Sequence, residues 1–346
     1  MLRPRECFNQ KVCRLAQEEI INIDVHGHFT PRSCLTTGEG NNRPNMPTLV
    51  ADTQGQENIV MGGYRTPAAS LSDPETRIKE MAASGIDFQI LSSSPRFLFY
   101  DREIEDALWF SQQQNDGIAD TVKEYPERFS GMAAIPLQEP KKALGELDRA
   151  INKLGLKGVE ILSHVNDRQL DDPELLPFYK EVEAMDVPVF IHPRGTRSEG
   201  MRSYHLGNLV GHPSNTTLAA AHLIFGGILE KFPNIKFCLA HGGGFLPYIR
   251  GRWEHGYEVR ADCKEIIKRP PSDYISLLYF DTITHSVPVL EFLVASMGAD
   301  RVMLGTDFPY DMGDLQPVSK VEGLTGISEE DRQKILGGNA ARIFNL

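Results

Sequence analysis

Eight short apolar runs recur along this chain, with helical segments between them. Most of the runs are nearly continuous apolar stretches, which is typical of parallel strands buried on both faces. The runs are 21–28, 88–92, 131–136, 158–163, 188–192, 235–241, 277–282 and 302–307. Eight alternations of strand and helix predict an α/β fold, the (β/α)8 barrel. An open doubly wound sheet is the competing fold, but no GxGxxG motif follows the first run, which disfavours it.

Local signals mark where several of the helices begin and end. Asp73 offers an N-cap, Pro74 follows at the first helical position, and Gly85 ends that helix. A second apolar run, 218–232, predicts a long helix that Pro233 ends. These signals agree with helices that connect successive parallel strands.

The chain divides into a short extension and one large domain. Residues 1–20 have no apolar h-region, so we interpret them as an N-terminal extension rather than a secretory signal. Residues 21–346 are expected to form the barrel. The segment at about 31–72 is rich in Gly, Pro, Asn and Thr and is too long for an ordinary loop after a strand. We therefore expect a small insertion there, folded over the mouth of the barrel.

The charge and the cysteines restrict partners and compartment. The net charge of −11 argues against nucleic acid or an anionic membrane as a partner, because both select basic surfaces. No stretch approaches the roughly 20 apolar residues of a membrane helix. The five cysteines are odd in number and form no CxxC pair, which indicates reduced thiols in a cytoplasmic protein.

Several of the predicted strands end in residues that can bind a metal ion. The first ends in His26-Gly27-His28, the fifth in His192 and the eighth in Asp307. A His-x-His pair places both imidazoles on one side of an extended strand, and in a barrel all carboxyl strand ends meet on one face. Imidazole and carboxylate suit zinc or a similar divalent ion. We predict that these four residues are the metal ligands, with room left for a water or substrate atom.

His241 ends the sixth run and is followed by three glycines. It is either a fifth ligand of a two-metal site or a free acid/base beside one metal ion. A two-metal site on this scaffold normally has a bridging lysine at the end of the fourth strand, where this chain has Ser163-His164 instead. One divalent ion, with His241 as the catalytic acid/base, is therefore favoured.

Three arginines are candidates for binding a carboxylate substrate. Arg65 lies in the predicted insertion, Arg194 follows His192-Pro193, and Arg252 lies eleven residues after His241. Guanidinium groups bind carboxylates through two parallel hydrogen bonds. The alternative for each arginine is a solvated surface charge.

Other polar residues near the predicted strand ends receive supporting roles. Asp281 is a candidate for orienting a ligand imidazole. His164, His212 and His285 are interpreted as structural residues that pack or cap loops.

A set of longer motifs extends this pattern over most of the chain. They are Asp24-Val25-His26-Gly27-His28, Asp73-Pro74-Glu75, Pro126-Glu127-Arg128-Phe129, Gly158-Val159-Glu160, His164-Val165-Asn166, His192-Pro193, Gly226-Gly227-Ile228-Leu229-Glu230-Lys231-Phe232-Pro233, Ala240-His241-Gly242-Gly243-Gly244 and Gly305-Thr306-Asp307-Phe308-Pro309. With these motifs the chain resembles the amidohydrolase-related family of 2-amino-3-carboxymuconate-6-semialdehyde decarboxylase (ACMSD). The resemblance runs from about Ile23 to the C-terminus.

The resemblance implies a distorted barrel with a small insertion domain and one zinc ion. His26, His28, His192 and Asp307 correspond to the family's metal ligands, and His241 corresponds to its catalytic histidine. Arg65 falls where the family places a carboxylate-binding arginine. Arg252 falls where the neighbouring subunit supplies a second such arginine, which implies a homodimer.

Two sequence features bear on the substrate that the resemblance implies. Arg194 replaces a pocket tryptophan of the family, which suggests a different and more polar acid. Related hydroxybenzoate decarboxylases typically open with Glu-x-His, whereas this chain has His26-x-His28, which favours a semialdehyde-type substrate and zinc over manganese.

The expected activity is the non-oxidative decarboxylation of an unsaturated or aromatic carboxylic acid. The alternative is a metal-dependent hydrolase of a lactone, amide or ester.

Overall fold

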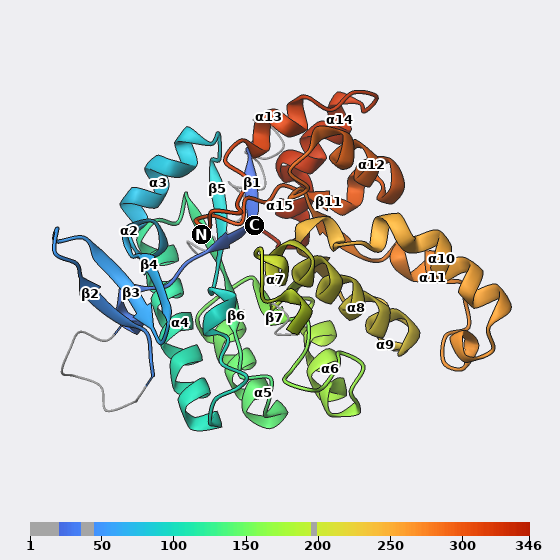
Figure 1. Cartoon of the computed structure of the whole chain (residues 1–346), viewed down its shortest axis with the longest axis horizontal. Coiled ribbons are helices and arrows are strands. Elements are labelled where there is room, and N and C mark those ends of the chain that lie inside the picture. Colours follow the sequence, from blue (N-terminus) through green and yellow to red (C-terminus); the bar gives the residue numbers. More distant parts are fainter. Residues whose placement is uncertain (1–20, 36–44, 195–198) are drawn as a thin grey trace, which may run out of the picture.

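Eight parallel strands form the barrel that the apolar runs predict (Figure 1). The computed structural model describes residues 21–35, 45–194 and 199–346, so the predicted extension at 1–20 lies outside the described residues. The strands are β1 Ile23–His28, β5 Phe88–Ser92, β6 Phe129–Ala134, β7 Gly158–Leu162, β8 Val189–His192, β9 Phe237–Leu239, β10 Tyr279–Asp281 and β11 Val302–Met303. Their order in the sheet is their order along the chain, which confirms the predicted fold class.

The two ends of the chain close the barrel against each other. The backbone N–H of Asp307 donates to the carbonyl of His26 (2.8 Å), and that of His28 donates to the carbonyl of Phe308 (2.7 Å). The last strand is shorter than the predicted 302–307, since Asp307 adopts a φ of 58° that no regular strand contains. The first and last runs of the sequence thus lie side by side at the closing seam.

Helices surround the barrel and cover its outer face (Figure 1). They are α2 Ala69–Ser72, α3 Pro74–Ala83, α4 Ile104–Glu124, α5 Pro140–Asp148, α6 Leu176–Met185, α7 Leu206–Leu209, α8 Gly211–Phe225, α9 Ile228–Lys231, α10 Leu246–Val259, α11 Pro271–Ile275, α12 Val287–Met297, α13 Pro317–Glu322, α14 Glu329–Gln333 and α15 Asn339–Ile343. Among the described ranges, none of these helices is long and apolar enough to cross a membrane.

The helix boundaries match the sequence signals at one site and depart from them at another. Asp73 caps α3 by accepting a hydrogen bond from the Thr76 backbone N–H, as predicted. The helix predicted over 218–232 instead begins at Gly211 and breaks after Phe225. Gly227 takes a φ of 75°, which favours glycine, and the short α9 continues from there.

Side chains fill the interior of the barrel. Ile90, Met132, Phe190, Cys238 and Met303 are fully buried in one cluster there. A second, larger cluster fills the layer between strands and helices. Because the barrel is packed and not hollow, a functional site can form only at an end of it.

The segment predicted as an insertion contains an antiparallel sheet of three strands, β2 Thr48–Ala51, β3 Glu57–Met61 and β4 Tyr64–Pro67. Figure 1 shows this sheet on the flank of the barrel. Its residue Ile59 shares a buried cluster with Phe97, which follows β5 at the carboxyl end of the barrel, and with Phe110 of α4. The insertion therefore borders the barrel mouth. The domain limits of 21–346 and about 31–72 remain predictions.

Candidate metal centre

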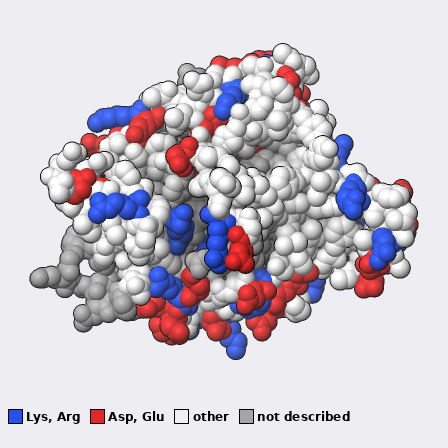
Figure 2. Space-filling view, in the orientation of Figure 1, with Lys and Arg blue, Asp and Glu red and all other residues white. Residues whose placement is uncertain are grey.

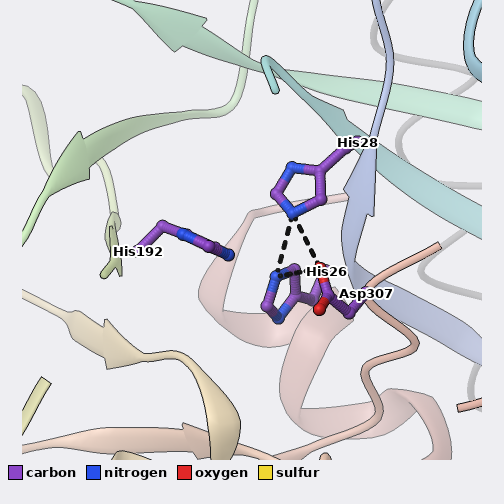
Figure 3. A group of neighbouring side chains, drawn as sticks. All are labelled: His26, His28, His192 and Asp307. Carbon is purple, nitrogen blue, oxygen red and sulfur yellow. Dashed lines mark hydrogen bonds and ion pairs between the residues drawn. The ribbon is translucent and has the colours of Figure 1, made fainter. Parts of the chain in front are cut away.

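Four predicted ligands converge at the carboxyl end of the barrel. His26 and His28 come from β1, His192 ends β8, and Asp307 follows β11. One donor atom of each lies within 4.8 Å of the donor atoms of the others, and all four residues are buried. Figure 3 shows their side chains pointing toward one another from separate parts of the chain. The barrel thus brings together residues up to 281 positions apart, from His26 to Asp307.

Hydrogen bonds to backbone carbonyls fix the tautomers of two of the imidazoles. Nδ1 of His28 lies 2.9 Å from the Ser93 carbonyl oxygen, and Nδ1 of His192 lies 2.7 Å from the Pro193 carbonyl oxygen. A carbonyl only accepts, so each Nδ1 must carry the proton. Each Nε2 is then left with a free lone pair, which is the form in which imidazole binds a metal ion.

Asp281 fixes the third imidazole in the same way. Its Oδ2 accepts from Nδ1–H of His26 at 2.7 Å and from the His241 backbone N–H at 2.9 Å. Its Oδ1 accepts from the Gly242 backbone N–H at 2.8 Å. The carboxylate therefore holds both His26 and the segment that carries His241, as expected for a residue that orients a ligand.

The spacing of the inward atoms fits one bound cation. Nε2 of His26 and Nε2 of His28 are 3.2 Å apart, and Asp307 Oδ1 lies 3.0 Å and 3.4 Å from Nε2 of His28 and of His26. Two ligand atoms at about 2.0–2.1 Å from one zinc ion would be roughly 2.8–3.4 Å apart, whether the ion has four ligands or five. Nε2 of His192 is buried without a hydrogen-bond partner among the described residues. Buried lone pairs that face one another are unfavourable unless a cation lies between them.

The electrostatic environment of the four residues favours a cation between them. Burial lowers the pKa of His28 and lowers that of His192 well below its usual value, so both imidazoles are neutral. Burial also opposes charge on His26, but Asp307 and Asp281 outweigh it and raise the His26 pKa to about 10. Burial of Asp307 by itself would raise the pKa of this carboxyl group. Neighbouring His26 outweighs the burial and holds the Asp307 pKa well below its usual range. A divalent ion would supply the positive charge that these carboxylates stabilise.

His241 lies beside the four residues and outside their cluster. It follows β9, and its Nε2 lies 3.4 Å from Asp307 Oδ2. Its Nδ1 is buried and has no hydrogen-bond partner in the described part of the chain. Its φ of 55° belongs to the strained backbone conformations that concentrate at functional sites. This geometry agrees with one ion and a neighbouring acid/base, although the role of His241 remains a prediction.

Gly244, the third glycine after His241, allows two backbone segments to approach each other closely. Gly244 has a φ of 65°, and a Cβ placed on it would lie 2.3 Å from the Pro213 carbonyl oxygen of α8. Thr217 strengthens the same contact, because its hydroxyl accepts from the Phe245 backbone N–H (2.8 Å) and donates to the Pro213 carbonyl (2.7 Å). The His241 loop and the start of α8 are therefore held together.

A cavity of about 490 Å³ opens onto His241 and Asp307. Residues from α7, α8, α10 and α12 form its walls, and most are apolar. The apolar lining includes Leu209, Pro213, Phe245, Pro247, Tyr248, Ile283, Pro288, Val289, Phe292, Leu293 and Met312. A pocket of this size and lining suits a small organic acid with a flat or unsaturated body.

His212 also lines this cavity. Its ring stacks on that of His241, with centroids 5.9 Å apart and planes inclined by 24°. The prediction of a purely structural role missed this placement, because His212 lies in the first turn of α8 and not at a strand end. The sequence signal for it was weak, because His212 is one of several further histidines, His205 among them, that follow the His192 strand.

None of the three predicted arginines is among the described residues that line this cavity. Arg65 is exposed on β4, and Arg252 is exposed on α10. Arg194 donates to Asp101 at 2.9 Å and faces a separate polar cavity of about 540 Å³ that His164 also lines. A substrate-binding role for each arginine remains a prediction.

Glu160 is a further carboxyl group at the base of the site. It lies in the middle of β7, fully buried, with Oε1 4.0 Å from Nδ1 of His28. Burial raises its pKa well above the usual value, which favours the neutral acid.

Comparisons with known proteins agree with this geometry. Residues 23–346 match the family model Amidohydro_2, described as amidohydrolase. The chain is 37% identical over 330 residues to 2-amino-3-carboxymuconate-6-semialdehyde decarboxylase of Dictyostelium discoideum, covering 94% of this chain and 92% of that protein. It is 32% identical over 286 residues to gamma-resorcylate decarboxylase of a Rhizobium species, covering 79% of this chain and 87% of that protein.

A solved structure has the same architecture. The dihydroxybenzoic acid decarboxylase of a Polaromonas species, crystallised with manganese and the inhibitor 2-nitroresorcinol, superposes with a TM-score of 0.77 at 27% identity. The match covers 94% of this chain and 97% of that one.

Proposed function

Because this chain belongs to the Amidohydro_2 family of amidohydrolases, we propose that it is a metal-dependent, non-oxidative decarboxylase of an aromatic or unsaturated carboxylic acid. The observation that carries the proposal is His241 beside a four-residue metal site at the end of an apolar cavity. The similarity to two kinds of decarboxylase supports this reaction over the hydrolysis of a lactone, amide or ester.

We propose zinc as the ion, held by His26, His28, His192 and Asp307. Three imidazoles and one carboxylate are a common zinc donor set. When bound, such an ion stabilises negative charge on a substrate oxygen. Manganese, which the Polaromonas structure contains, is the alternative that metal analysis of the purified protein would distinguish.

His241 is proposed to handle the proton. In the reaction the bond between the substrate carbon and its carboxylate breaks, CO2 leaves, and the electron pair stays on that carbon. His241, which lines the cavity and whose Nε2 lies 3.4 Å from Asp307 Oδ2, delivers the proton that forms the new C–H bond. One proton is consumed for each CO2 released, and no oxidant or reductant takes part.

Arg65 and Arg252 are proposed to bind carboxylate groups of the substrate, with Arg252 reaching the site of a partner subunit. Tyr248 precedes Arg252 by one helical turn on α10 and is 84% exposed. Phe245 and Phe292 are also exposed at this edge of the cavity. Figure 2 shows a broad uncharged surface over α8 and the adjoining parts of α10 and α12. Exposed apolar surface of this kind supports a homodimer. Arg194 is a third, weaker candidate for the substrate.

A cytoplasmic location is proposed from the cysteines. Cys34, Cys238 and Cys263 are free thiols, and the first two are buried. Unpaired buried thiols are usual in a reducing compartment.

The test of this function is CO2 release from a panel of aromatic and unsaturated acids, without any redox cofactor. Lactones and esters of similar size belong in the same panel, because the alternative reaction would consume them. Release of CO2 in equal amount to substrate lost supports the proposal. Substrate loss by hydrolysis or hydration, without CO2, would overturn it.

A further inference from the structure

Besides His241, two imidazoles that the proposed reaction does not use line the cavity, His212 and the exposed His285. His212 lies in the first turn of α8 and faces the cavity beside His241 and His192, with ring centroids 5.9 Å and 6.1 Å away. It belongs to no predicted ligand set, and it lies outside the group of four metal-binding residues. A polar side chain between apolar walls is a candidate for substrate recognition.

A hydrogen bond fixes which ring nitrogen of His212 carries the proton. The side-chain amide of Asn208 lies 3.3 Å from His212 Nδ1. An amide N–H only donates, so Nδ1 accepts, and the proton of the neutral ring is on Nε2. Nε2 makes no hydrogen bond to any residue in the described ranges. It is therefore a free N–H donor on a residue that lines the cavity.

With Nδ1 accepting from the Asn208 amide, the His212 ring is the neutral imidazole. A neutral N–H donor pairs well with an uncharged oxygen, whereas a carboxylate gains more from a guanidinium group. His212 is therefore expected to bind an uncharged oxygen of the substrate, whereas the predicted arginines are expected to bind carboxylate groups.

The position of His212 relative to His241 is rigid. The contact of Gly244 with the Pro213 carbonyl and the two hydrogen bonds of Thr217 join the His241 loop to the first turn of α8. The donor therefore keeps a constant position relative to the acid/base, as substrate orientation requires.

We propose that His212 is a substrate-positioning residue that donates a hydrogen bond from Nε2 to an uncharged oxygen of the substrate. The proposed substrate class is thereby narrowed to carboxylic acids that carry a hydroxyl or carbonyl oxygen in addition to the carboxylate. This inference rests on the proposed function for the site, but its test measures binding and not turnover.

The test compares the binding of benzoate with that of the three monohydroxybenzoates to the metal-loaded protein by calorimetry. In the wild type, at least one hydroxybenzoate should bind more tightly than benzoate. In His212→Phe, which keeps an aromatic ring against His241 but has no N–H, that advantage should fall by roughly 3- to 10-fold, the usual value of one neutral hydrogen bond. His212→Gln restores a donor and should recover part of the advantage.

His222→Phe is the matched control. His222 lies on the same helix, pairs with Asp171 at the surface and does not line the cavity, so it should leave the preference unchanged. The inference is wrong if His212→Phe weakens benzoate and every hydroxybenzoate by the same factor, or changes none of them. If His212→Phe shifts the preference while the wild type releases no CO2, the inference stands and the proposed reaction fails. If the wild type releases CO2 and His212→Phe does not shift the preference, the proposed reaction stands and the inference fails.

Discussion

Asp281 accepts a hydrogen bond from Nδ1 of His26 at 2.7 Å while it also accepts the backbone N–H of His241. A single carboxylate thus links a predicted metal ligand to the predicted acid/base. Its role can be tested by one conservative substitution.

Asp281→Asn should weaken metal binding by roughly 10- to 100-fold, the usual effect of losing a partner that orients a ligand. An asparagine oxygen can still accept from His26 and from the His241 backbone N–H, but the NH2 group then opposes the backbone N–H groups of Gly242 and Ile283. Metal affinity measured by competition with a chelator checks this. Asp171→Asn is the control, because Asp171 pairs with Nδ1 of the half-buried His222 (2.9 Å) outside the group of four metal-binding residues. Equal affinities in Asp281→Asn and wild type would contradict the role.

His26→Ala and Asp307→Ala should each lose metal and activity together. Each variant removes one of the four predicted donors to the ion, so the three that remain should bind it more weakly. Metal content of the purified proteins, measured by mass spectrometry, checks the expectation, with the exposed His205→Ala as control. A variant that keeps a full equivalent of metal would show that the altered residue is not a ligand.

His241→Ala should keep its metal and lose activity by roughly 10²- to 10⁴-fold in kcat, as expected for an acid/base. The measurement pairs metal content with steady-state kinetics on the best substrate of the CO2 panel. If the variant instead holds half the metal of the wild type, His241 is a ligand and the site binds two ions.

Mixing Arg65→Ala and Arg252→Ala subunits should restore activity if Arg252 serves the partner's site. Random exchange makes about half of the dimers mixed, and each mixed dimer has one site of two with both arginines intact. Activity should therefore reach about a quarter of wild type, from two parents that are each nearly inactive. No recovery after demonstrated subunit exchange would show that Arg252 does not act across the interface.

The stability of the fold should depend on His212 in acid. Its folded pKa of about 4 lies below the unfolded value near 6.5, so between these pH values the unfolded chain binds more protons. The free energy of unfolding contributed by His212 is therefore complete above pH 6.5 and falls as the pH drops toward 4. Burial is the largest cause of this low pKa, followed by the charges of His241, Asp307, Arg96 and His205, of which Asp307 alone raises it.

Urea unfolding of wild type and His212→Phe across this range measures the effect. The difference between the two free energies should change by on the order of 2 kcal/mol, after allowance for the partial exposure of the ring. A constant difference from pH 7 to pH 4 would show that the folded pKa of His212 is not depressed.

The strands and the metal cluster could be predicted because both depend on local sequence. Each strand is a short apolar run, and each predicted ligand ends such a run, so periodicity and position were sufficient. The barrel rule then brought His26, His192 and Asp307 to one face without knowledge of any side-chain contact.

What the sequence did not reveal depends on contacts between distant segments. Arg194 pairs with Asp101, which lies 93 residues earlier in the loop after β5. His212 faces the cavity only because α8 begins at Gly211, seven residues before the apolar run 218–232 that predicts this helix in the sequence. Neither fact can be derived from spacing, since both follow from how loops pack against the barrel.

The closing seam of the barrel sets the order of events when the protein is made. His26 is translated 281 residues before Asp307, yet their backbones hydrogen-bond to each other and their side chains belong to one group that could hold a metal ion. A nascent chain in which the Asp307 segment has not yet been made has the histidines but lacks the fourth predicted ligand. Metal binding in the predicted geometry must therefore wait until that segment has been made, and a bound ion would connect the two sides of the seam.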